Sequence, residues 1–134
     1  MNELKVFTLK EVNELLPVLT QLFAELHAKR DLAVKTEVQI DSLELISSST
    51  HTSAQELKRL TEIHRRLVSE FYAVVDQIHG YGCIIKDVDL GLLDFYGIVS
   101  GRVVYLCWQL GEPEISYWHE TGQGYVNRQP LIPD

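Results

Sequence analysis

Cysteine is scarce in this sequence of 134 residues, and basic side chains are outnumbered by acidic ones. The two cysteines, Cys83 and Cys107, form no C-x-x-C unit, so the sequence supports neither a disulfide framework nor a zinc ribbon. There are 12 basic and 19 acidic residues, which gives a net charge of −7. This balance argues against nucleic acid as a partner, because a nucleic-acid groove needs clustered Lys and Arg.

Long apolar runs are also missing. No stretch approaches the roughly 18 consecutive apolar residues that a membrane helix requires. The opening residues, MNELKVFTLKEVNE, place acids among lysines and contain no apolar segment of a secretory signal. We therefore predict no membrane partner and a cytoplasmic location. The residues that are present, 46% hydrophobic and 23% charged, are typical of a single folded domain over residues 1–134.

The chain up to about residue 80 has the pattern of amphipathic helices. Thr8 and Glu11 form a capping box that predicts the start of a helix. An apolar face then recurs at steps of three or four residues, at Leu9, Val12, Leu16, Leu19, Phe23 and Leu26, and resumes with an offset at Val34, Val38 and Leu45. Pro17 interrupts this pattern, so we expect a kink or a restart of the helix there.

A second helix is predicted after the polar stretch at 47–53 (SSSTHTS), which is typical of a turn. Ser53 and Glu56 form another capping box. A coiled-coil-like heptad seam follows, formed by Leu57, Leu60, His64, Leu67, Phe71, Val74 and Ile78. Two long helices joined by a short turn predict an antiparallel hairpin over about residues 8–79.

Residues 81–134 change in character, because they hold eight of the 12 aromatic residues and many of the glycines. The segments CIIKDV, GLLDF, RVVYLCW and EISYWH have the pattern of short strands, and the connections between them are too short for crossover helices. We therefore predict an α+β fold, in which the long antiparallel helical hairpin is followed by a small antiparallel β-sheet of three or four strands over about residues 83–128.

Three motifs in this second part, KDVDLGLLDF, VYLCWQLGEPEISYWHE and the G-x-x-x-R-x-P pattern of Gly124, Arg128 and Pro130, resemble bacterial proteins catalogued as domain of unknown function 2203. The opening FTLKEVNELLPVL is similar to the start of that family, so the resemblance covers essentially the whole chain. The resemblance implies no particular reaction. It implies that motif positions are occupied by Asp87, Asp94, Trp108, Glu112, Trp118, His119 and Arg128.

Acidic residues and one histidine gather in the second part, and this mixture can hold a divalent metal. The candidate metal ligands are Asp87, Asp94, Glu112 and His119. Glu114 and His119 face opposite sides of a regular strand, so they are not a ligand pair. The alternative is that the acids are turn and edge-strand charges, while His119 makes a hydrogen bond within the fold. No cofactor is predicted from the sequence, with a divalent metal as the open alternative.

Aromatic side chains near one arginine suggest a different kind of site. Trp108, Trp118 and Arg128 are candidate ligand-binding residues, because such rings can stack on a flat ligand while the guanidinium binds an anion. The alternative is that the tryptophans fill the core. Cys107 is expected to be a small buried apolar residue, with His119 as its conceivable basic partner. His64 is expected to be a core histidine bonded to Glu25 or Asn13, or to a second copy of the chain.

Three classes of function remain open from the sequence. The leading hypothesis is a non-enzymatic binding module that forms a homodimer through its helices, since the hairpin has more apolar surface than a small sheet can cover. The second is a small metal-dependent enzyme of hydrolase type. The third is a small-ligand sensor with an aromatic pocket. An unidentified protein or small molecule is the partner that these hypotheses imply.

Overall fold

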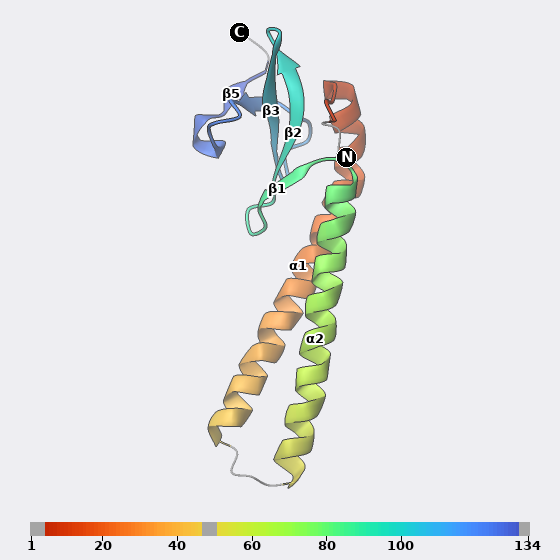
Figure 1. Cartoon of the computed structure of the whole chain (residues 1–134), viewed down its shortest axis with the longest axis vertical. Coiled ribbons are helices and arrows are strands. Elements are labelled where there is room, and N and C mark those ends of the chain that lie inside the picture. Colours follow the sequence, from red (N-terminus) through yellow and green to blue (C-terminus); the bar gives the residue numbers. More distant parts are fainter. Residues whose placement is uncertain (1–4, 47–50, 132–134) are drawn as a thin grey trace. The chain divides into compact units, whose positions relative to one another are not determined.

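The computed structural model describes residues 5–46 and 51–131 and confirms the predicted α+β fold (Figure 1). Two long helices, α1 (Leu9–Ile46) and α2 (His51–Gly80), are followed by five short strands. The chain divides into two compact units, one formed by Met1–Phe23 with Asp76–Asp134 and the other by Ala24–Val75. Each unit is described by itself below.

The start of α1 is held by the predicted capping box. The Thr8 backbone N–H donates to Glu11 Oε1 at 2.8 Å, and the Glu11 N–H donates to Thr8 Oγ1 at 3.1 Å. The first of these bonds lowers the pKa of Glu11. The expected restart at Pro17 is wrong, because α1 runs through this residue without interruption. Its buried neighbours Leu16 and Leu19 pack into the core, which offsets the one backbone hydrogen bond that proline removes.

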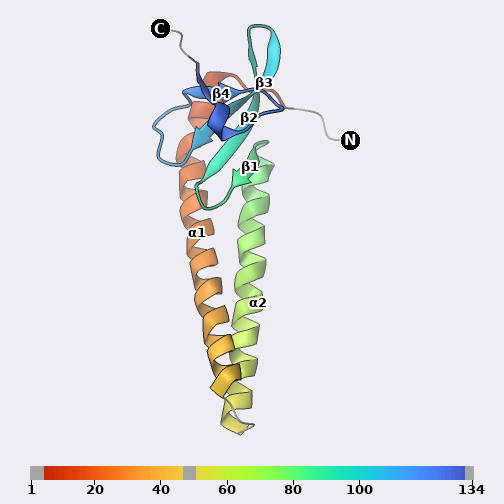
Figure 2. The ribbon, with the colours of Figure 1, turned by 90° about the vertical axis from the view of Figure 1, so that its left-hand side faces the viewer.

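In the Ala24–Val75 unit, α1 and α2 lie side by side and antiparallel, as both views show (Figures 1 and 2). The predicted offset of the apolar face of α1 is wrong, since Val34, Val38 and Leu45 are exposed. The face continues instead with a heptad spacing through the buried or half-buried residues Ala33, Thr36, Ile40 and Leu43. The hydroxyl of Thr36 is satisfied locally, because it donates to Leu32 O at 2.7 Å.

The heptad seam of α2 is confirmed as the side that turns inward. Its buried members are Leu60, Leu67, Val74 and Ile78, and its half-buried members are Leu57, His64 and Phe71. Instead of Glu25 or Asn13, the residue facing His64 is Glu37, whose Oε2 lies 3.9 Å from His64 Nε2. Lys29 Nζ donates to Glu70 Oε1 at 2.8 Å and ties the two helices together.

The cap and the turn that were predicted before α2 can be compared with the structure only in part. Helix α2 begins at His51, so Ser53 lies inside the helix and the prediction that it is the N-cap is wrong. The helix begins two residues earlier than the predicted cap, a difference of the size by which helix boundaries commonly vary. The turn predicted at 47–53 overlaps residues 47–50, which lie outside the described part of the chain.

The sheet has five strands, one more than the upper limit of the prediction: β1 (Ile84–Asp87), β2 (Leu92–Val99), β3 (Arg102–Gln109), β4 (Tyr117–His119) and β5 (Gln129–Pro130). Their order is β1-β2-β3-β4-β5, and every neighbouring pair is antiparallel. The additional strand is the extended tail, whose Gln129 pairs with Trp118 of β4. The connections are short, as an antiparallel meander requires.

The tight turn between β2 and β3 sets the register of the central hairpin. Ser100 and Gly101 form a two-residue loop and have positive φ angles of 52° and 78°. Such loops match the twist of the strands that they join. The turn pairs Val99 with Arg102, and this register continues to Leu92 opposite Gln109.

The two faces of the sheet have different chemistry. On one face Phe95 is fully buried and packs edge-on against Phe7, with ring centroids 5.2 Å apart. Leu93, Leu106 and Trp108 are also buried and share this face by alternation along the strands. The opposite face presents Asp94 and Cys107, which are directly opposite each other in the register. Asp94 and Cys107 therefore lie on the face of the central hairpin that is opposite to Phe95 and Leu106.

Candidate functional site

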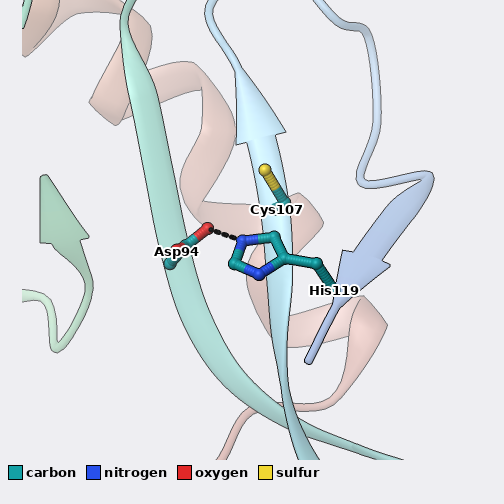
Figure 3. A group of neighbouring side chains, drawn as sticks. All are labelled: Asp94, Cys107 and His119. Atoms are coloured by element: carbon teal, nitrogen blue, oxygen red, sulfur yellow. Dashed lines mark hydrogen bonds and ion pairs between the residues drawn. The ribbon is translucent and has the colours of Figure 1, made fainter. Parts of the chain in front are cut away.

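Three adjacent strands bring an aspartate, a cysteine and a histidine together. Asp94 belongs to β2, Cys107 to β3 and His119 to β4, and their side chains converge in Figure 3. One oxygen of Asp94, the sulfur of Cys107 and a ring nitrogen of His119 all lie within 4.8 Å of one another. The three residues are 1%, 1% and 2% exposed. A polar cluster buried to this degree is unusual and needs a structural or chemical reason.

The two ring nitrogens of His119 have different partners. Nδ1 lies 2.9 Å from the backbone oxygen of Glu120, which only accepts, so Nδ1 carries the hydrogen. Nε2 lies 3.1 Å from Asp94 Oδ1. A single proton therefore joins Nε2 to this carboxyl oxygen, either on the ring or on the acid. Both nitrogens are engaged, which leaves no free base on His119 for Cys107.

Burial controls the ionisation of the other two members of the cluster. Loss of water raises the pKa of Asp94, while His119 and Lys86 lower it in part. Burial raises the pKa of the Cys107 thiol to about 12, and the nearby charge of Asp94 adds to this effect. Cys107 is therefore a neutral thiol at pH 7. The conceivable Cys107–His119 nucleophile does not have the geometry or the ionisation that it needs.

One oxygen of the cluster is left unsatisfied. Asp94 Oδ2 is buried and has no hydrogen-bond partner among the described residues. The nearest cation is the ammonium of Lys86, whose Nζ is 3.9 Å away and so beyond hydrogen-bond distance. Leaving a buried carboxylate oxygen unpaired costs about 1–3 kcal/mol or more. A cation at this position would remove that cost.

The cluster forms the inner wall of a pocket of about 250 Å³. The other lining residues are Lys86, Asp87, Leu92, Gln123, Gly124 and Tyr125. Lys86 and Asp87 come from β1, while Gln123–Tyr125 belong to the segment between β4 and β5. Residues of β1 and of this segment therefore line the pocket together with the buried cluster.

The four predicted metal ligands do not all come together in the structure. Asp94 and His119 meet in the cluster, and Asp87 lines the same pocket while its Oδ1 accepts the Leu90 backbone N–H at 2.8 Å. Glu112 points elsewhere, because both of its oxygens lie 2.7 Å from Arg128 Nη2. The structure therefore does not bring Glu112 together with Asp94 and His119.

Cys107 is the member of the cluster that the sequence did not place in a metal site. The signal that was available is the Ser100–Gly101 turn, since a two-residue loop there makes residue 94 face residue 107. Counting back from that turn would have paired Asp94 with Cys107. The pairing of His119 on β4 could not be found in this way, because the connection between β3 and β4 is not a two-residue turn that fixes the register.

The predicted ligand-binding residues take other positions. Trp108 is fully buried and its Nε1 donates to Glu112 O at 2.9 Å, while Trp118 is also buried. The Arg128 guanidinium lies over two aromatic rings, 4.0 Å from the centroid of Tyr117 and 4.6 Å from that of Tyr125. Its guanidinium is already paired with Glu112. None of the three lines the pocket beside Asp94.

Comparison with known families agrees with the resemblance in the motifs. A family model for an uncharacterised conserved protein, DUF2203, matches residues 5–131. The chain belongs to the DUF2203 family. The matched region includes both helices and the three residues of the cluster. No curated protein and no solved structure matches the chain. Within the described residues, no helix is both long and apolar enough to cross a membrane.

Proposed function

We propose that this DUF2203 protein binds one divalent transition metal ion through Asp94, Cys107 and His119. The observation that supports the proposal is the convergence of one ligand atom from each residue within 4.8 Å. A tetrahedral site with metal–ligand bonds near 2.0–2.1 Å has edges of about 3.3 Å. The 3.1 Å between Asp94 Oδ1 and His119 Nε2 is close to such an edge.

The chemistry of the donors favours a zinc-like ion. Thiolate and imidazole ligands suit Zn²⁺ and related metals, whereas Mg²⁺ and Ca²⁺ prefer oxygen ligands alone. His119 has the arrangement expected of a metal ligand, since Nδ1–H donates to the carbonyl of Glu120 and directs Nε2 into the cluster. A divalent cation would also stabilise the Cys107 thiolate, which burial otherwise disfavours.

Three protein ligands are one fewer than structural zinc sites use, and are typical of catalytic sites. The remaining coordination position would face the pocket, which is the accessible side of the cluster. An ion there would supply Lewis-acid chemistry to a ligand in the pocket. This supports the hypothesis of a small metal-dependent enzyme, with Cys107 in the ligand set in place of Glu112 and Asp87.

The test is metal binding by the full-length protein after treatment with a chelator. We expect native mass spectrometry to show one Zn²⁺ per chain, and Co²⁺ to give a thiolate-to-metal charge-transfer absorption. Cys107→Ser and His119→Asn should lose both signals. Cys83→Ser is the matched control, because Cys83 is equally buried but donates to Ile78 O at 3.3 Å, outside the cluster. Absence of a stoichiometric metal, or equal binding by Cys107→Ser, would refute the proposal.

One observation supports a second proposal, self-association through the helices. The exposed apolar residues Val34 and Val38 lie one turn apart on α1, and Leu45 is exposed two turns further along. They sit on a face that α2 does not cover within the Ala24–Val75 unit. A second copy of the chain that covered this face would remove apolar surface from water.

A further inference from the structure

Lys86 lies beside the proposed metal site, and its side chain brings a positive charge to the lining of the pocket. Its Nζ lies 3.9 Å from Asp94 Oδ2 and 4.7 Å from the centroid of the Tyr105 ring. The side chain is 42% exposed, so the ammonium group is accessible from the pocket. Its ammonium group thus lies near one carboxylate and one aromatic face.

Metal binding would change the electrostatic partners of Lys86. A divalent ion bound to one thiolate, one carboxylate and one neutral imidazole leaves a centre with no net formal charge. The negative charge of Asp94 would then be shared with the metal and would attract Lys86 less. The ammonium of Lys86 would then face the open side of the metal centre, and its attraction to Asp94 would be weaker. An anionic group in the pocket would meet both the metal and this cation.

Asp87 limits how much negative charge the pocket accepts. It lines the same cavity, and its Oδ1 accepts the Leu90 N–H. Lys86 and Asp87 together contribute no net charge. Asp87 would repel a dianion more strongly than a monoanion, so a monoanion that contacts Lys86 is favoured. The cavity of about 250 Å³ is smaller than the roughly 300–1,000 Å³ of typical ligand pockets, which restricts the ligand to a small molecule.

We propose that the metal-loaded pocket binds a small monocarboxylate. One carboxylate oxygen occupies the open coordination position, and the other accepts a hydrogen bond from Lys86. This inference rests on the proposed metal site and deepens it by assigning the chemical class of the ligand and a role for Lys86 in binding it.

The test uses the full-length protein loaded with Co²⁺, whose visible spectrum reports changes in coordination. Acetate is the probe, inorganic phosphate is the dianionic comparison, and ionic strength is held constant. We expect acetate to shift the spectrum saturably. Lys86→Met should weaken acetate binding about tenfold, the scale of one charge-assisted hydrogen bond. Lys58→Met is the matched control, since Lys58 is an exposed lysine of α2.

The outcomes separate this inference from the metal proposal. If Co²⁺ does not bind the wild-type protein, the metal site itself is refuted. If Co²⁺ binds one to one but acetate leaves its spectrum unchanged, or Lys86→Met binds acetate as tightly as wild type, the ligand assignment alone is overturned. Tighter binding of phosphate than of acetate by the wild type would also overturn it. We expect Asp87→Asn to bind phosphate more tightly than the wild type does.

Discussion

His119 Nε2 lies 3.1 Å from Asp94 Oδ1, although the two residues are on different strands and Cys107 lies on the strand between them. Both side chains are 2% exposed. Because both groups are buried, the loss of either one would leave the other without its partner. In the proposal above, a metal ion would take the place of the proton between these two atoms.

Loss of His119 should be costly in the protein without metal. In His119→Ala, Asp94 stays buried and loses its partner, so we expect the free energy of unfolding to fall by about 3–5 kcal/mol. Asp94→Asn keeps the shape and carries no charge, and should cost about 1–2 kcal/mol. Urea unfolding of the chelator-treated variants measures both. Equal losses of under about 0.5 kcal/mol would show that the pair does not stabilise the fold.

Metal affinity should rise with pH. The pKa of the Cys107 thiol is raised to about 12, so metal binding at neutral pH must release its proton. The apparent affinity should therefore increase about tenfold per pH unit for each proton released. Competition with a coloured chelator between about pH 6 and 8 measures the slope. An affinity of the wild type that does not change with pH over this range would argue against thiolate coordination.

Gly97 should not tolerate a side chain. A Cβ at this position would lie 2.5 Å from Cγ of Leu106, which is itself buried and cannot move away. We expect Gly97→Ala to lower the free energy of unfolding by about 1–3 kcal/mol, the usual cost of overpacking. Gly122→Ala is the control, because a Cβ there meets nothing within 4 Å. Thermal unfolding of the two variants compares them, and similar midpoints would contradict this view of the packing.

Self-association through α1 should depend on its exposed apolar residues. If the second proposal holds, native mass spectrometry of the wild type shows a dimer, and Val34→Glu with Val38→Glu shifts it to a monomer. Gln39→Glu adds a charge to an exposed neighbouring position and should leave the dimer intact. A monomeric wild type, or a dimer that persists in the double variant, would rule out this face as the interface.

The elements of the fold could be predicted from local patterns, because each depends on neighbouring residues. The Thr8–Glu11 box marks the start of α1, and the heptad seam of α2 turns inward as its spacing implies. In α1 the same reasoning failed, since Val34 and Val38 are apolar but Thr36 is the buried residue. The position of α2 decides which face of α1 is buried. The hydrophobicity of the α1 residues alone did not reveal that face.

The sequence by itself therefore determined the family, the helical hairpin, the antiparallel sheet and two of the three residues in the cluster, Asp94 and His119. The tertiary structure alone decided that Cys107 joins them and that Glu112 pairs with Arg128 instead. The physical reason is that helix caps and periodicity act over a few residues. The convergence of Asp94, Cys107 and His119 requires two strand registers and the placement of β4, which are set by packing across the sheet.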